Sequence, residues 1–222
     1  MLKKIIFSAL LLGQSMMAQN TITSNLGDFN EIKVYRGITV NLIKSGEQKI
    51  VIEGEKSSDV VVKNINGVLK ITMAIIQTFS AKDVSVTVYY KNLDILDSNE
   101  GSILTSKEII NQDKLTVKSQ EGGQIDLTVK VKNLDAKCIS GGVVKLKGSA
   151  DSLNVIANSG GIFSGDNLLT ERANISSSTG AQCTVNVSKY LDADAKIGAV
   201  ITVLGKPVEI LKTESLGGYI RN

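Results

Sequence analysis

Residues 134–146 read Leu-Asp-Ala-Lys-Cys-Ile-Ser-Gly-Gly-Val-Val-Lys-Leu, and residues 153–165 repeat this order as Leu-Asn-Val-Ile-Ala-Asn-Ser-Gly-Gly-Ile-Phe-Ser-Gly. In both stretches apolar residues recur at every second position on either side of a Ser-Gly-Gly corner. Such alternation is typical of a half-buried β-strand, and paired glycines are typical of a sharp turn. Each stretch therefore predicts two short strands joined by a glycine corner.

The same unit recurs through the second half of the chain. Seven corner glycines follow one another at intervals of 21, 19, 19, 20, 18 and 19 residues: Gly101, Gly122, Gly141, Gly160, Gly180, Gly198 and Gly217. Apolar residues stand seven positions before six of them, and eight before the first: Leu93, Leu115, Leu134, Leu153, Ala173, Leu191 and Ile210. Two positions further on stand Ile95, Val117, Ala136, Val155, Ile175, Ala193 and Lys212. A period of about twenty residues predicts units that bury their apolar faces by stacking on their neighbours.

Stacking in register predicts an all-β, single-stranded parallel β-solenoid (β-helix) of about seven glycine-cornered coils. Equivalent strands would lie about 4.8 Å apart, so the coils would form a rod roughly 30 Å long. The two strands of a unit can instead pair with each other, because glycine turns also make hairpins. A sandwich of hairpins therefore stays open as the alternative.

The first residues do not belong to this repeat. Lys3 and Lys4 precede a short apolar run, residues 5–12, and Ala18 supplies a small residue before a cleavage point, which is typical of a secretory signal peptide. We expect a signal peptide over residues 1–18 and one solenoid domain over residues 19–222. Within that domain we expect N-terminal strands and a cap over 26–90 and the repeats over 91–222.

The N-terminal strands lack the glycine period. Asn66-Gly67 lies between two apolar runs and predicts a hairpin turn. We expect these strands to cover the first coil, because an open strand edge pairs with other chains. At the other end, Lys212, Glu214 and Arg221 are expected to blunt an exposed edge, where self-association of the chain is possible.

Composition argues against several classes of protein. Of the 25 basic residues, Lys3 and Lys4 lie in the leader, which leaves 23 against 22 acidic residues and a net charge of +1. Acids and lysines alternate along the strands, so we expect no nucleic-acid partner. The chain has no histidine, which excludes a Ser-His-Asp or Cys-His catalytic constellation. Cys138 and Cys183 occupy different repeat positions and are expected to be buried, unpaired thiols.

Several motifs together suggest a family. They are the opening Gly27-Asp28-Phe29, the alternating Ile32-x-Val34 and Ile38-x-Val40-x-Leu42, the segment 66–71, the serial Ser-Gly-Gly corners and the segment 204–207. On these residues the whole mature chain resembles the bacterial putative auto-transporter adhesin family with a head GIN domain, a domain of unknown function of the Bacteroidetes type. The resemblance implies an exported protein of the periplasm, outer-membrane surface or extracellular space. It carries over no catalytic, cofactor-binding or metal-binding residue.

We therefore expect a non-enzymatic envelope protein without a cofactor, with adhesin-like binding of a glycan or a surface protein and no membrane span in the mature chain. One alternative is a carbohydrate-active β-helix enzyme, a lyase or hydrolase, using Asp192 and Asp194 with Arg172 nearby. Another is a module for envelope assembly or maintenance. The tyrosines available for sugar stacking are Tyr89, Tyr90, Tyr190 and Tyr219, although packing at strand ends also explains them.

Overall fold

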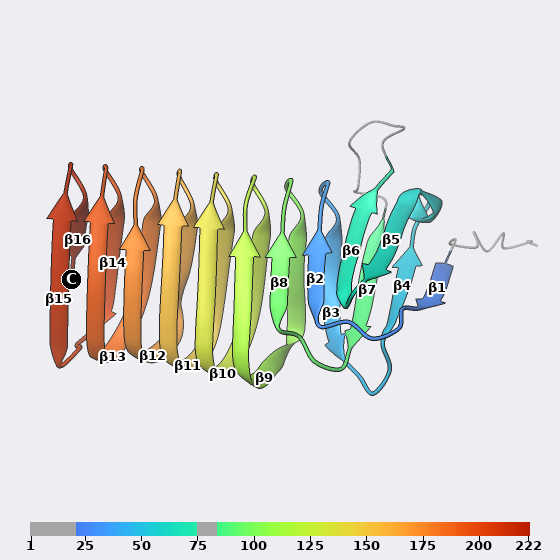
Figure 1. Cartoon of the computed structure of the whole chain (residues 1–222), viewed down its shortest axis with the longest axis horizontal. Coiled ribbons are helices and arrows are strands. Elements are labelled where there is room, and N and C mark those ends of the chain that lie inside the picture. The colour runs from blue at the N-terminus through green and yellow to red at the C-terminus, as the bar shows by residue number, and fades with distance from the viewer. Residues whose placement is uncertain (1–20, 75–83) are drawn as a thin grey trace, which may run out of the picture.

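Long parallel strands dominate the computed structural model, which describes residues 21–74 and 84–222 (Figure 1). The predicted signal peptide lies outside the described residues. One short 3₁₀ helix, η1 (Ser57–Asp59), interrupts an otherwise all-β order. The strands are β1 (Thr21–Asn25), β2 (Glu31–Val34), β3 (Thr39–Lys44), β4 (Lys49–Glu53), β5 (Val60–Ile65), β6 (Val68–Met73), β7 (Ser85–Tyr90), β8 (Ile95–Ser98), β9 (Ile103–Ser119), β10 (Gln124–Ile139), β11 (Val143–Asn158), β12 (Ile162–Ser177), β13 (Gln182–Lys196), β14 (Val200–Gly205), β15 (Glu209–Ser215) and β16 (Tyr219–Arg221).

The coils stack in parallel, as the repeat predicts. Strand β10 pairs with β9 on one side and β11 on the other, both parallel, so consecutive strands do not fold back as hairpins. The predicted leucine column is a true column, because the register places these residues opposite one another from coil to coil: Leu115, Leu134, Leu153, Ala173, Leu191 and Ile210. The parallel β-solenoid is confirmed, and the sandwich of hairpins is wrong.

Each coil contributes to two faces of a flattened stack. The pre-corner face consists of the strand segments that lead into a corner, namely β2, β8, the second halves of β9 to β13, and β15. The post-corner face consists of the segments that follow, namely β3, the first halves of β9 to β13, β14 and β16. Apolar side chains from both faces fill the narrow interior, which forms one continuous core along the rod.

The corners are two-residue turns in which both residues have positive φ. At one of them Ser140 has φ 49° and Gly141 has φ 72°, and the N–H of Gly142 donates to the carbonyl of Ile139 over 2.9 Å. These values define a type I′ turn, which explains the glycine at the second position. The corners also bond to one another, since the N–H of Gly141 donates to the carbonyl of Ser159 in the next coil over 3.1 Å. The corners therefore help to hold the coils in register.

One coil lies outside the seven predicted repeats. Arg36 and Gly37 have φ 60° and 71°, and they form a corner between β2 and β3. The N–H of Gly37 donates to the carbonyl of Glu100 over 2.9 Å, so this corner stacks directly on the Glu100-Gly101 corner. The N-terminal strands thus include a complete coil, although they do not follow the glycine period along the sequence.

Further strands cover this first coil. Strand β6 joins β2 and forms an antiparallel hairpin with β5 through Asn66-Gly67, which confirms the predicted turn and the N-terminal capping strands. On the other face, β7, β4 and β1 follow β3 (Figure 1). One predicted position is wrong: Ile95 pairs with Thr116, and Leu96, which is fully buried, pairs with Val117. The insertion before the first corner shifts the alternation by one residue.

Candidate functional site

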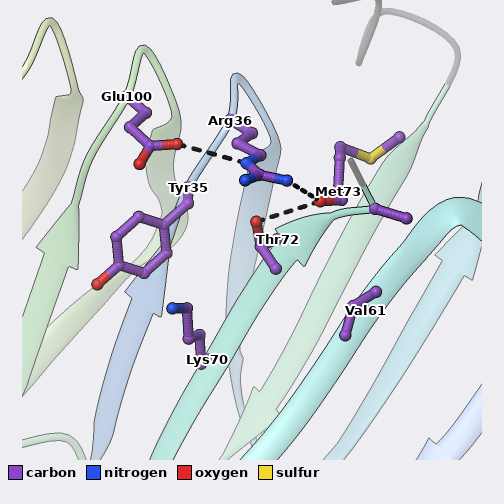
Figure 2. Close-up of a pocket in the computed structure, with 8 residues that line it drawn as sticks. Tyr35, Arg36, Val61, Lys70, Thr72, Met73 and Glu100 are labelled. Carbon is purple, nitrogen blue, oxygen red and sulfur yellow. Dashed lines mark hydrogen bonds and ion pairs between the residues drawn. The ribbon is translucent and has the colours of Figure 1, made fainter. Parts of the chain in front are cut away.

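A pocket of about 490 Å³ opens where the capping strands meet the first two coils. We call it the junction pocket. Its walls include Tyr35 and Arg36 from the first corner, Lys70 and Met73 from β6, and Glu100 from the next corner (Figure 2). Pockets of about 300–1,000 Å³ with apolar walls and a few polar groups are typical of small-ligand sites. The residues come from three parts of the chain that meet only because the strands pair in parallel.

Arg36 is held in place by two contacts. Its Nη1 donates to the carbonyl oxygen of Met73 over 2.8 Å, and its Nε lies 3.7 Å from the Glu100 carboxylate (Figure 2). A guanidinium has five N–H donors, so these contacts fix its orientation and leave donors for a ligand. The Glu100 side chain is 43% exposed, and an ion pair that exposed is weak. Arg36 is therefore positioned but only loosely neutralised.

Lys70 and Tyr35 form the second pair in the pocket. The Lys70 ammonium lies 4.6 Å from the centre of the Tyr35 ring, a cation–π contact. Partial burial, with a further contribution from the Asp97 carboxylate, raises the pKa of Tyr35 above its ordinary value, so the hydroxyl stays neutral. The pocket thus offers two cations and an aromatic ring, which together suit an anionic or hydroxylated ligand.

The predicted catalytic candidates lie elsewhere. Asp192 and Asp194 do share one side of β13, and with Asn154 and Asn174 they line a hollow of about 240 Å³ on the pre-corner face, here called the aspartate hollow. Arg172 is opposite Tyr190 in the register and does not line this hollow. The side-chain amide of Asn174 donates a hydrogen bond to the side-chain oxygen of Asn154 over 3.1 Å. The structure brings the two carboxylates together but leaves the arginine outside.

The four predicted tyrosines differ in exposure. Tyr89 and Tyr90 point to opposite sides of β7: Tyr90 is buried in the core, and Tyr89 is half-buried with the Lys49 ammonium 4.9 Å from its ring. Tyr190 is half-buried, and Tyr219 on the last coil is exposed. Sequence reasoning missed Tyr35, Arg36 and Lys70 as a group. The Arg-Gly pair next to an alternating strand was the available signal for the corner.

Within residues 21–74 and 84–222, no group of three or more cysteine, aspartate or glutamate side chains is placed to hold a metal ion. Nor does that part of the chain contain a helix with the length and apolar character needed to cross a bilayer. Cys138 and Cys183 are both buried free thiols, as expected.

The sequence profile of the family described as putative auto-transporter adhesin, head GIN domain, matches residues 28–207. The chain belongs to this family. The match covers the capping strands other than β1, the junction pocket and all coils up to the last, so the pocket lies within the GIN domain. The search of curated proteins found no significant match.

Solved structures share the fold. A putative adhesin from Bacteroides fragilis aligns with a TM-score of 0.83 at 19% identity, over 93% of this chain and 97% of that one. A putative adhesin from Parabacteroides merdae aligns with a TM-score of 0.68 at 14% identity, over 92% and 96%. A putative lipid binding protein from Parabacteroides distasonis aligns with a TM-score of 0.67 at 15% identity, over 92% and 96%. At such low identities the likeness establishes the architecture of the GIN domain and no ligand.

Proposed function

We propose that this GIN-domain protein is an exported, non-enzymatic adhesin of the cell envelope that binds a glycan or a surface protein. The observation that carries the proposal is the junction pocket, where two positioned cations and an aromatic ring face an open hollow. Such a combination recognises ligands through charge, hydrogen bonds and ring stacking. The names of the family and of its structural neighbours are consistent with an adhesin-like role.

The rigid stack supports this role physically. The coils present flat faces whose outward residues are fixed by the strand register, so a partner meets a preformed surface. A preformed surface loses little conformational entropy on binding. The family, together with the predicted signal peptide, favours the periplasm, the outer-membrane surface or the extracellular space as the location.

A glycan and extracellular-matrix array tests the proposal. The purified chain from residue 19 onward contains every described residue and is applied beside a heat-unfolded sample of the same protein. We expect saturable binding that unfolding abolishes. Absence of any saturable signal across the array would contradict an adhesin that acts on these ligands.

One observation favours a carbohydrate-active enzyme as a second candidate, namely the pairing of Asp192 and Asp194 in the aspartate hollow. Paired carboxylates are the usual equipment of glycoside hydrolases. Incubation with polysaccharides followed by an assay for new reducing or unsaturated ends tests this candidate. Product that disappears in the double variant Asp192→Asn and Asp194→Asn would support the enzyme. Equal amounts of product from wild type and variant would show that these two aspartates are not catalytic.

Self-association is favoured by a separate observation at the last coil, where Leu211, Leu216 and Tyr219 are exposed. The charged residues expected to blunt this end are also exposed, and Arg221 donates to Thr202 over 3.0 Å. Size-exclusion chromatography of the wild type and of Leu211→Lys tests whether this end pairs with a second copy. A larger species in the wild type that is lost in the variant supports pairing, whereas identical monomer peaks exclude it.

A further inference from the structure

The junction pocket lies at the end of a row of lysines on the pre-corner face. In the strand register Lys63 is opposite Lys70, and Lys70 is opposite Lys33. The row continues across the first coils through Asp97 and Lys118 to end on β10 at the side chain of Lys137. Neighbouring strands lie about 4.8 Å apart, so this lysine row spans about 24 Å across six strands. Asp97, Lys118 and Lys137 each stand four positions before a corner glycine, but Lys33, Lys63 and Lys70 lie outside the seven predicted repeats, so the sequence does not reveal the row as a whole.

Most of these cations have no acidic partner. Within residues 21–74 and 84–222, no carboxylate lies within 4.0 Å of the ammonium groups of Lys63, Lys70, Lys118 or Lys137. Lys33 is the exception, since it pairs with Glu31 over 3.0 Å. The row therefore carries unneutralised positive charge on a protein whose expected mature net charge is only +1.

The one acid in the row lies on the same side of the sheet as the lysines but is almost fully covered by its neighbours. Asp97 is only 6% exposed, and its Oδ1 accepts a hydrogen bond from the Asn99 side chain over 3.0 Å. A ligand on the surface therefore meets the lysines and not this carboxylate. Further along the same row the register replaces lysine by Ile156, Ser176 and then Asp194. The lysines of this row are thus confined to the half of the row that adjoins the junction pocket.

We propose that the lysine row and the junction pocket together bind an acidic glycan, a polysaccharide whose sugars carry carboxylates. This inference rests on the proposed adhesin function and names its ligand class. One sugar ring packs against Tyr35 and the apolar wall of the pocket, where Arg36 and Lys70 meet its carboxylate. The following carboxylates lie along the row. The spare guanidinium donors suit a planar carboxylate, and the ring of Tyr35 suits the apolar face of a sugar.

Binding of oligogalacturonate tests the inference, because it carries one carboxylate on each sugar. Neutral maltooligosaccharide of the same length and single-stranded DNA are the comparison ligands. The test variant is Lys63→Gln with Lys70→Gln, both exposed and without an ion pair among the described residues. The matched control is Lys130→Gln with Lys147→Gln, which removes the same charge from exposed positions on the first halves of β10 and β11.

We expect oligogalacturonate binding that weakens with added salt, and an affinity about tenfold lower in the Lys63/Lys70 variant, equivalent to about 1.4 kcal/mol. The control variant should bind like the wild type, and both should keep the circular dichroism of the wild type. Equal binding of maltooligosaccharide, or no change in the Lys63/Lys70 variant, would overturn the acidic-glycan assignment and leave the adhesin proposal standing. Binding of DNA as tight as that of oligogalacturonate would overturn it as well. If neither carbohydrate binds and the array is also negative, the proposed function fails together with the inference.

Discussion

Two adjacent glycines at one corner allow a direct test of how closely the coils approach. An ideal Cβ on Gly142 would lie 2.1 Å from the carbonyl oxygen of Ser119 in the preceding coil, whereas a Cβ on Gly141 meets no atom within 4 Å. Gly141 has φ +72° instead, which L-residues rarely adopt. Alanine at position 142 therefore creates a steric clash between coils, and alanine at position 141 creates only backbone strain.

The size of the difference follows from these distances. Relieving the clash at Gly142 means moving the Ser119 oxygen from 2.1 Å to at least 3.0 Å, which separates the coils by 0.9 Å at the corner. The neighbouring bond from the Val143 N–H to the Gly123 carbonyl, now 2.9 Å, would stretch beyond hydrogen-bonding distance. Overpacking and about two weakened hydrogen bonds together cost about 4 kcal/mol. The left-handed conformation alone costs about 1 kcal/mol in Gly141→Ala.

Urea titration followed by circular dichroism measures both variants against the wild type. We expect Gly142→Ala to unfold at a much lower urea concentration, with a melting temperature lower by about 8–16 °C for a domain of this size. The free energy of unfolding should fall in Gly141→Ala by only about a quarter of the loss expected for Gly142→Ala. If the two variants unfold at the same urea concentration, the corners do not approach as closely as described and the argument from stacking is refuted.

Three other groups give further predictions. Tyr90 is buried, its hydroxyl has no hydrogen-bond partner among the described residues, and burial raises its pKa to about 12, so Tyr90→Phe should keep or raise stability by about 1 kcal/mol in urea titration. A clear loss in this variant would mean that the hydroxyl is bonded. Burial raises the pKa of the Asp97 carboxyl above its ordinary 3.8, so the folded state binds the carboxyl proton more tightly than the unfolded state does. The stability of the protein therefore falls as the pH rises from the unfolded-state pKa through the folded-state pKa. Asp97→Asn should therefore be more stable than wild type at neutral pH, with the advantage lost at about pH 3, and an unchanged or larger advantage in acid would contradict this sign. Burial also raises the pKa of both thiols, that of Cys183 to about 11, so a thiol reagent should label Cys138 and Cys183 only on unfolding; rapid labelling of the native protein would show that this core opens.

Much of the fold could be predicted because the repeat is local. The distance from each corner glycine to its core leucine is nearly constant, so alternation alone identifies residues such as Leu134 and Leu153 as neighbours in one column. The first coil could not be found in this way. Its corner, Arg36-Gly37, lies 64 residues before Gly101 because the capping strands are inserted between two coils that stack directly on each other.

The candidate site could not be predicted for the same physical reason. Tyr35, Lys70 and Glu100 meet only after β2 pairs with both β6 and β8. Periodicity shows which side of a strand faces outward, but it does not show which distant strands lie side by side. The pairing of the two aspartates of β13 could be predicted from the sequence, because residues two positions apart in one strand lie on the same face.

Hydrogen–deuterium exchange of the wild-type protein, with and without bound oligogalacturonate, tests the central claim most directly. The account predicts slower exchange of backbone amides around Tyr35, in β6 and at the corner that contains Glu100, and no change in β15 or β16. Protection confined to the last coils or to the post-corner face would contradict the assignment of the junction pocket and the lysine row as the binding surface.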